Sequence, residues 1–222
     1  MGTSSAGNAQ YQRLVTDLLG VMAYGELSAF GRLSSDARYA PTLHDRALLG
    51  RIAVIEFQHF ELASARLEEL GVDAEETMLP FQRSVDHFHE RTKPGDWYES
   101  LMKAYVIDTV SSDFYRSVSE FLDADTRELV ERILVSEEST AVLRELLQHA
   151  LAEDPRLASR LALWGRRLVG EALTQAQRVS MEHALLGPLL SSTGDARETV
   201  GKLTADLAER HSRRMTGLGL TA

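Results

Sequence analysis

The segment from Thr42 to Leu70 is organised by helical periodicity. Its apolar residues recur at steps of three and four, which predicts one helix with a single buried stripe. The stripe consists of Leu48, Leu49, Ile52, Ile55, Ala63 and Leu67. Glu56 and His59 fall on this stripe or at its edge, and residues three apart on a helix are neighbours. We therefore expect a carboxylate and an imidazole to project together toward the core.

Two interpretations of Glu56 and His59 are open at this point. A buried carboxylate is costly unless it has a partner, and the two side chains could hydrogen-bond to each other in an ordinary helical bundle. Alternatively they share a metal ion, as the Glu-x-x-His pattern does in four-helix bundles with di-iron centres. The metal interpretation requires buried carboxylates on other helices, because one helix supplies only part of such a site.

The composition is typical of a soluble globular protein. The chain has 222 residues, 44% of them hydrophobic, and no cysteine. Thiolate metal sites are therefore excluded, and any metal must bind to Asp, Glu or His. The formal charge of −9 opposes nonspecific attraction to nucleic acids. No apolar run is long enough to span a membrane. Residues 1–10 predict a disordered tail without the apolar core of a signal peptide, so we expect a cytoplasmic protein.

Periodicity and helix-ending residues predict six helices. They cover residues 14–33, 42–70, about 96–122, about 126–151, 155–186 and 196–215. Thr42 and Asp96 are the expected N-caps of the second and third helices. Between these helices, Pro80 is expected to break residues 72–95 into two short helices. A connection of this length lets the second and third helices run parallel, as in four-helix bundles with one long crossover.

The expected fold is all-α, because the chain shows neither alternating strands and helices nor a Gly-rich phosphate loop. It is a four-helix bundle with a long crossover between the second and third helices. We expect a single domain over residues 11–216, with its core bundle at about 11–151. The additional helices at about 155–216 exceed what a four-helix core needs. We expect them to cover one side of the bundle or to form the interface of a homodimer.

Three more acidic residues lie on or beside the apolar stripes of their helices. They are Glu26 on the first helix, Asp108 on the third and Glu137 on the fourth. Four carboxylates meeting in a dry core would repel one another strongly, and a divalent metal ion would remove that repulsion. Carboxylate and imidazole ligands suit iron or manganese. The predicted metal ligands are Glu26, Glu56, His59, Asp108 and Glu137.

Three segments carry a resemblance to a known family. Glu56-Phe-Gln-His59-Phe-Glu61 is similar to its second-helix Glu-x-x-His motif, and Asp108 followed by Asp113 resembles its third-helix segment, which usually has Glu at both positions. Ser136-Glu137-Glu138-Ser139-Thr140 is similar to its fourth-helix Ser-Glu-x-x-His motif. Over about residues 11–190 the chain resembles the ferritin-like superfamily, and within it the MiaE-like tRNA hydroxylases, especially an actinobacterial branch. The resemblance implies two nonheme irons and O₂-dependent hydroxylation of an isopentenyl group on a modified adenosine in tRNA.

The chain departs from this family pattern at Thr140, where the family has histidine. A threonine hydroxyl is a poor ligand for iron, so one metal ion, an asymmetric pair or none are all open. One expected function is hydroxylation of an alkyl C–H bond in a modified tRNA or a small apolar substrate, with an unidentified electron donor. The other is a non-catalytic ferritin-like scaffold that binds a small ligand. Tyr105 and Tyr115 are expected to line the substrate cavity.

Overall fold

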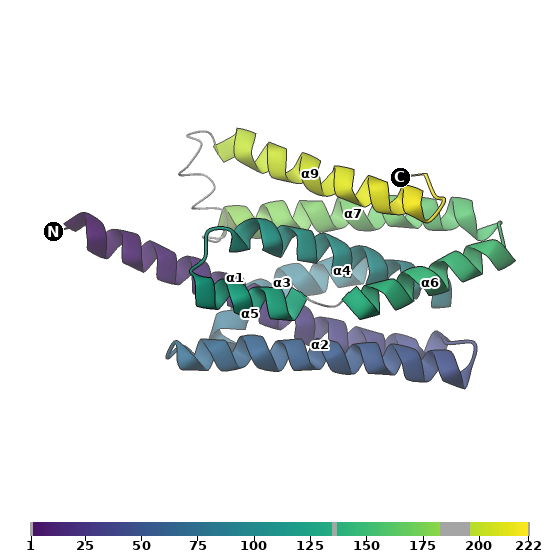
Figure 1. The fold of residues 1–222 in the computed structure, drawn as a ribbon, viewed down its shortest axis with the longest axis horizontal. Helices are drawn as coiled ribbons and strands as arrows, with labels where there is room; N and C mark the ends of the chain where they lie inside the picture. Colours follow the sequence, from purple (N-terminus) through teal and green to yellow (C-terminus); the bar gives the residue numbers. More distant parts are fainter. Residues whose placement is uncertain (1, 135–136, 183–195, 222) are drawn as a thin grey trace.

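The first two long helices form an antiparallel hairpin in the computed structural model, which describes residues 2–134, 137–182 and 196–221 (Figure 1). They are α1 (Gly2–Asp36) and α2 (Leu43–Glu69), joined through the 3₁₀ turn η1 (Ala37–Tyr39). The chain continues through α3 (Ala74–Arg91), α4 (Trp97–Ser119), α5 (Ala124–Leu134) and α6 (Glu137–Glu153). It ends with α7 (Leu157–Glu182) and α9 (Ala196–Gly217). α2 and α4 run in the same direction with α3 between them in the chain, which confirms the predicted all-α bundle with a crossover.

The expected caps of α2 and α4 are present. The side chain of Thr42 accepts a hydrogen bond from the backbone N–H of Asp45, and Asp96 accepts one from Glu99. Gly71 follows α2 with φ of 76°, a left-handed conformation that glycine adopts without the steric penalty of a Cβ. These local interactions explain why periodicity and capping residues locate both helix starts.

The prediction of two short helices between α2 and α4 is wrong, because α3 is continuous through Pro80. Proline lacks a backbone N–H and therefore leaves a carbonyl one turn earlier without its helical partner. Asp73 caps the helix by accepting from Glu76, and Phe81 and Phe88 are buried on its inner face. Burial of this face against α1 and α7 offsets the lost hydrogen bond.

The predicted fourth helix is divided in two. α5 ends at Leu134 and α6 begins at Glu137, so that one expected helix over 126–151 is replaced by two. Residues 135 and 136, between these two helices, lie outside the described residues. The other difference is at the N-terminus, where α1 begins at Gly2 although residues 1–10 were expected to be a disordered tail.

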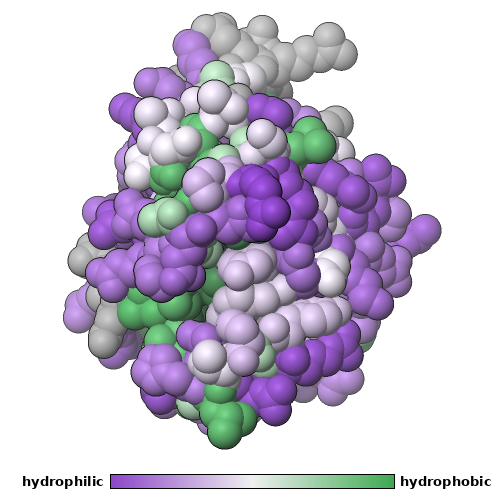
Figure 2. Space-filling view, turned by 90° about the vertical axis from the view of Figure 1, so that its right-hand side faces the viewer, coloured by the Kyte–Doolittle hydropathy of each residue, from purple (hydrophilic) through white to green (hydrophobic). Residues whose placement is uncertain are grey.

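The additional helices lie together on one side of the bundle. α7 packs against α3 and α4, and α9 packs against α4 and α7 (Figure 1). None of the described helices is long and apolar enough to cross a membrane. Figure 2 shows one face of the molecule, where hydrophilic residues predominate and hydrophobic ones appear between them. The homodimer stays a prediction.

Candidate metal centre

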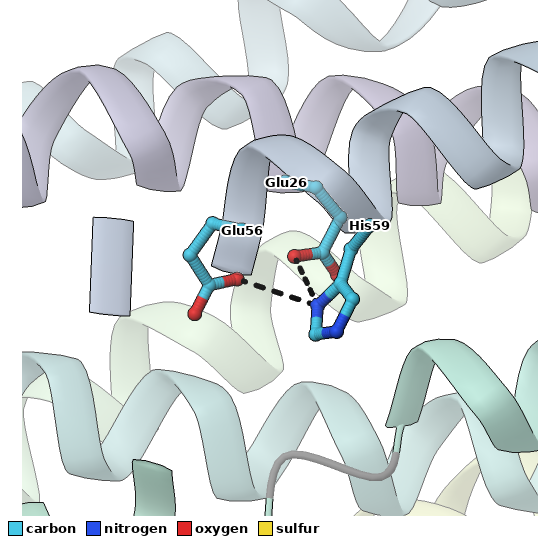
Figure 3. Close-up of side chains that lie close together, drawn as sticks. All are labelled: Glu26, Glu56 and His59. Carbon is cyan, nitrogen blue, oxygen red and sulfur yellow. Dashed lines mark ion pairs between the residues drawn. The ribbon is translucent and has the colours of Figure 1, made fainter. Parts of the chain in front are cut away.

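Three of the predicted ligands converge at one point between α1 and α2. Glu26 comes from α1, and Glu56 and His59 come from α2, one turn apart (Figure 3). The Nδ1 atom of His59 lies 3.7 Å from Oε2 of Glu26 and 4.0 Å from Oε2 of Glu56. One donor atom from each side chain lies within 4.8 Å of the others, so the group could hold a metal ion.

The buried surroundings of these three side chains disfavour their charged forms. Burial raises the pKa of Glu26 to about 7, and burial together with the hydrogen bond to Glu26 raises the pKa of Glu56 well above its usual range. Burial also lowers the pKa of His59. Two carboxylates this close in a dry site cannot both be charged without a compensating cation. The donor set and this missing positive charge fit a divalent ion such as iron or manganese.

Asp108 lies on α4 and lines the same cavity as the three converging residues, but it is not part of their close group. Its carboxylate accepts a short hydrogen bond from the hydroxyl of Thr140 on α6. Burial raises the pKa of Asp108 to about 6, and the bond from Thr140 counteracts this rise. The residue at the expected histidine position therefore holds a predicted ligand by its hydroxyl group.

The remaining site predictions have different outcomes. Glu137 is the first residue of α6, and its side chain lies outside the described part of the structure. Tyr115 is buried and lines the cavity, as expected for a substrate-contacting residue. Tyr105 is also buried, but it is not among the residues that line this cavity, so its contact with a substrate stays a prediction.

The cavity has a volume of about 210 Å³ and extends from the three donors through the interior of the bundle. Much of its wall is apolar. Typical wall residues are Val21, Ile52, Val110, Phe114, Leu143 and Val179. An apolar wall beside a polar group of ligands excludes water and can hold an alkyl group against the site.

Sequence reasoning missed the basic side chains that line this cavity. Arg32 lies on α1 six residues after Glu26, and it favours the charged form of Glu56 electrostatically. Lys103 is buried and donates a hydrogen bond to the carbonyl of Thr92 at 2.8 Å. Its burial lowers its pKa to about 7. No sequence signal distinguishes Arg32 or Lys103 from a solvated basic residue.

Comparisons with known proteins agree with this geometry at the level of the fold. A search of curated proteins found no match. The family model described as a ferritin-like domain of actinomycetes matches residues 9–193, which include most of α1, all of α2 to α7 and all five predicted metal ligands. The chain belongs to this ferritin-like domain family of actinomycetes.

Proposed function

We propose that this ferritin-like protein binds an iron or manganese ion at Glu26, Glu56 and His59 and oxidises an alkyl C–H bond of a small substrate in the adjoining cavity. The convergence of three donor atoms within 4.8 Å at an apolar cavity is the observation that supports this proposal. A redox-active ion at this position would supply O₂-dependent chemistry, with electrons from a separate donor.

The chain's own residues would serve that chemistry in distinct ways. Glu26, Glu56 and His59 would bind the ion, with Asp108 as a further carboxylate held in place by Thr140. Arg32 adds positive charge on the same cavity wall and limits the charge imbalance. The apolar wall would orient the alkyl group and keep bulk water away.

For the substrate we favour a small molecule over tRNA. The MiaE-like resemblance supplies the reaction class, alkyl hydroxylation, whereas its tRNA substrate suits this chain less well. The formal charge of −9 opposes a polyanion. A cavity of about 210 Å³ is also smaller than most ligand pockets, which occupy roughly 300–1,000 Å³.

Metal analysis tests the proposal. Protein purified from iron-supplemented cells should contain about one equivalent of iron or manganese per chain, and His59→Ala should lose most of it because one of three donors is gone. His149→Ala is the matched control, since His149 is exposed on α6 and pairs with Glu153, away from the three donors. Less than about three tenths of an equivalent in the parent protein would contradict metal binding.

A non-catalytic scaffold is the second candidate function, and the hydrogen bond from Thr140 to Asp108 favours it. In that case the hydroxyl replaces a metal as the partner of a buried carboxylate. Thr140→His separates the two candidates. If α6 is correctly aligned with the family motif, the variant should bind more metal than the parent. An unchanged metal content would show that this alignment is wrong.

A further inference from the structure

A groove with an excess of positive charge runs between α3 and α7 on the outside of the bundle. Four arginines and one glutamate line it, so its formal charge is +3 with His87 neutral, in a chain of −9. We call it the basic groove. Its arginines are Arg91, Arg166, Arg167 and Arg178. The groove has a volume of about 530 Å³, which is large enough for the head group of a small molecule.

Only one of these arginines is neutralised by an acid of the groove. Arg91 forms an ion pair with Glu171 at 2.8 Å. Arg167 donates to the carbonyl of Arg91 and Arg166 donates to the carbonyl of Thr221, so neither has a carboxylate partner there. Within the described residues, Arg178 forms no hydrogen bond or ion pair. The groove therefore offers charge and N–H donors to an anion.

The wall between the basic groove and the cavity is thin. On α3, His87 lines the groove and His89 lines the cavity. On α7, Gln175 lines both spaces and is 8% exposed. Its amide oxygen is buried without a hydrogen-bond partner, and so is Nδ1 of His89. Unpartnered buried polar atoms are costly, and these two mark the wall between the two spaces as a place where a ligand can bind.

We infer that the protein binds a small organic phosphate, with its phosphate in the basic groove and its apolar chain passing Gln175 into the cavity toward Glu26, Glu56 and His59. Arginine guanidinium groups match the geometry of phosphate oxygens. A single phosphate group complements a local charge of +3, whereas a nucleic acid would meet the repulsion of the whole chain. The inference rests on the proposed function in one respect, because it treats this organic phosphate as the substrate of the proposed oxidation.

The cavity limits the length of the apolar chain. Its volume of about 210 Å³ is small for a ligand pocket, so a short unbranched alkyl chain suits it best. Octyl phosphate is therefore a suitable probe, with octanol and inorganic phosphate as its two separate halves. In calorimetric titrations of the metal-free protein, octyl phosphate should bind at least about tenfold more tightly than either half. Raising the salt concentration should weaken its binding.

Two variants test the two parts of the site. Arg178→Glu should weaken octyl phosphate at least about tenfold and leave octanol unchanged, because only the phosphate meets the groove. Arg51→Glu is the matched control, since Arg51 is an exposed arginine on α2 outside both spaces. Ala176→Trp should weaken octyl phosphate and leave inorganic phosphate unchanged, because Ala176 lines the cavity and not the groove, and the larger side chain would fill part of the cavity. Thermal melts check that each variant is folded.

Three outcomes would overturn the inference. Equal affinity for octyl phosphate and inorganic phosphate would show a groove that binds anions alone, and equal affinity for octanol would show that the groove is not used. Tighter binding of a single-stranded RNA, lost in Arg178→Glu, would make the groove a nucleic-acid surface. Metal content is measured separately, so a chain that binds octyl phosphate without binding metal would refute only the proposed function.

Discussion

At the level of single residues, periodicity located the donors that share a helix face. Glu56 and His59 are neighbours because a helix places residues three apart side by side, and Glu26 follows from the stripe of α1. The same reasoning could not determine whether Asp108 reaches the other donors, because that depends on how α4 is placed against α2. The hydrogen bond that Asp108 accepts from Thr140 could not be predicted either, since the two residues are 32 positions apart in the sequence.

The raised pKa of Glu26, from 4.5 to about 7, predicts a pH-dependent stability of the metal-free protein. The unfolded chain releases this proton near pH 4.5, whereas the folded protein keeps it up to about pH 7. The carboxyl group therefore makes the folded state progressively less stable as the pH rises from about 4.5 to about 7. Glu26→Gln removes this contribution, so its melting temperature should rise relative to the parent's between about pH 5 and pH 8.

The comparison needs a control, because other buried groups also titrate. Glu61→Gln changes an exposed residue of α2, and its melting temperature should follow that of the parent at every pH. If Glu26→Gln also follows the parent, Glu26 is not protonated in the metal-free fold. Added manganese should raise the melting temperature of the parent most at the higher pH, because bound metal displaces protons.

At the level of helices, caps and turns could be predicted locally, but contacts between distant helices could not. Asp113 on α4 does not line the cavity that Asp108 lines. Its partners are Arg214, at 2.6 Å, and Arg210, at 3.5 Å, both on α9. No spacing in the sequence relates residues about a hundred positions apart, so the docking of α9 was not predictable.

This ion pair predicts a large effect for Asp113→Asn. The carboxylate is 3% exposed, and its loss leaves Arg214 partly buried without a partner. We expect a loss of about 2–3 kcal/mol in the free energy of unfolding, below the full value for a buried pair because Arg214 is 25% exposed. Urea titration of the variant and the parent measures this difference in the free energy of unfolding. Asp206→Asn, at the exposed partner of Arg210, is the control and should cost about 0.5 kcal/mol or less. If both variants lose the same free energy of unfolding, the ion pair of Asp113 does not hold α9 in place.

Two glycines of α1 should respond to alanine in opposite directions. A Cβ at Gly20 would lie 2.7 Å from the backbone oxygen of Thr77 on α3, whereas a Cβ at Gly31 meets no atom within 4 Å. Gly20→Ala should therefore destabilise the protein by about 1–3 kcal/mol through overpacking. Gly31→Ala should stabilise it by about 0.5–1 kcal/mol, because alanine favours the helix. Thermal melts compare them, and a stabilising Gly20→Ala would show that α1 and α3 are not in close contact.

At the level of the whole molecule, the bundle and its crossover were predictable because helix lengths and connection lengths restrict the topology. The separate helices α5 and α6 were not predicted, because apolar residues recur at helical spacing on both sides of residues 135–136. The covering position of α7 and α9 corresponds to one of the two expected roles of these helices.

The homodimer remains to be measured. The described surface exposes several large apolar residues, including Leu43, Val54 and Leu163. Light scattering at micromolar concentration should give twice the chain mass of 24.7 kDa if a homodimer forms. A monomeric mass would refute the dimer and leave α7 and α9 with a covering role only.

The three donors of the candidate metal centre all belong to the hairpin of α1 and α2, the pair of helices that pack most extensively on each other. Closing one short connection brings them together, and the entropic cost of such closure is small. The hairpin can thus bind a metal ion before the later helices dock on it, and even before the ribosome has synthesised them. Stopped-flow refolding with manganese should then be faster than without it. A metal effect confined to the unfolding rate would mean that the hairpin closes late.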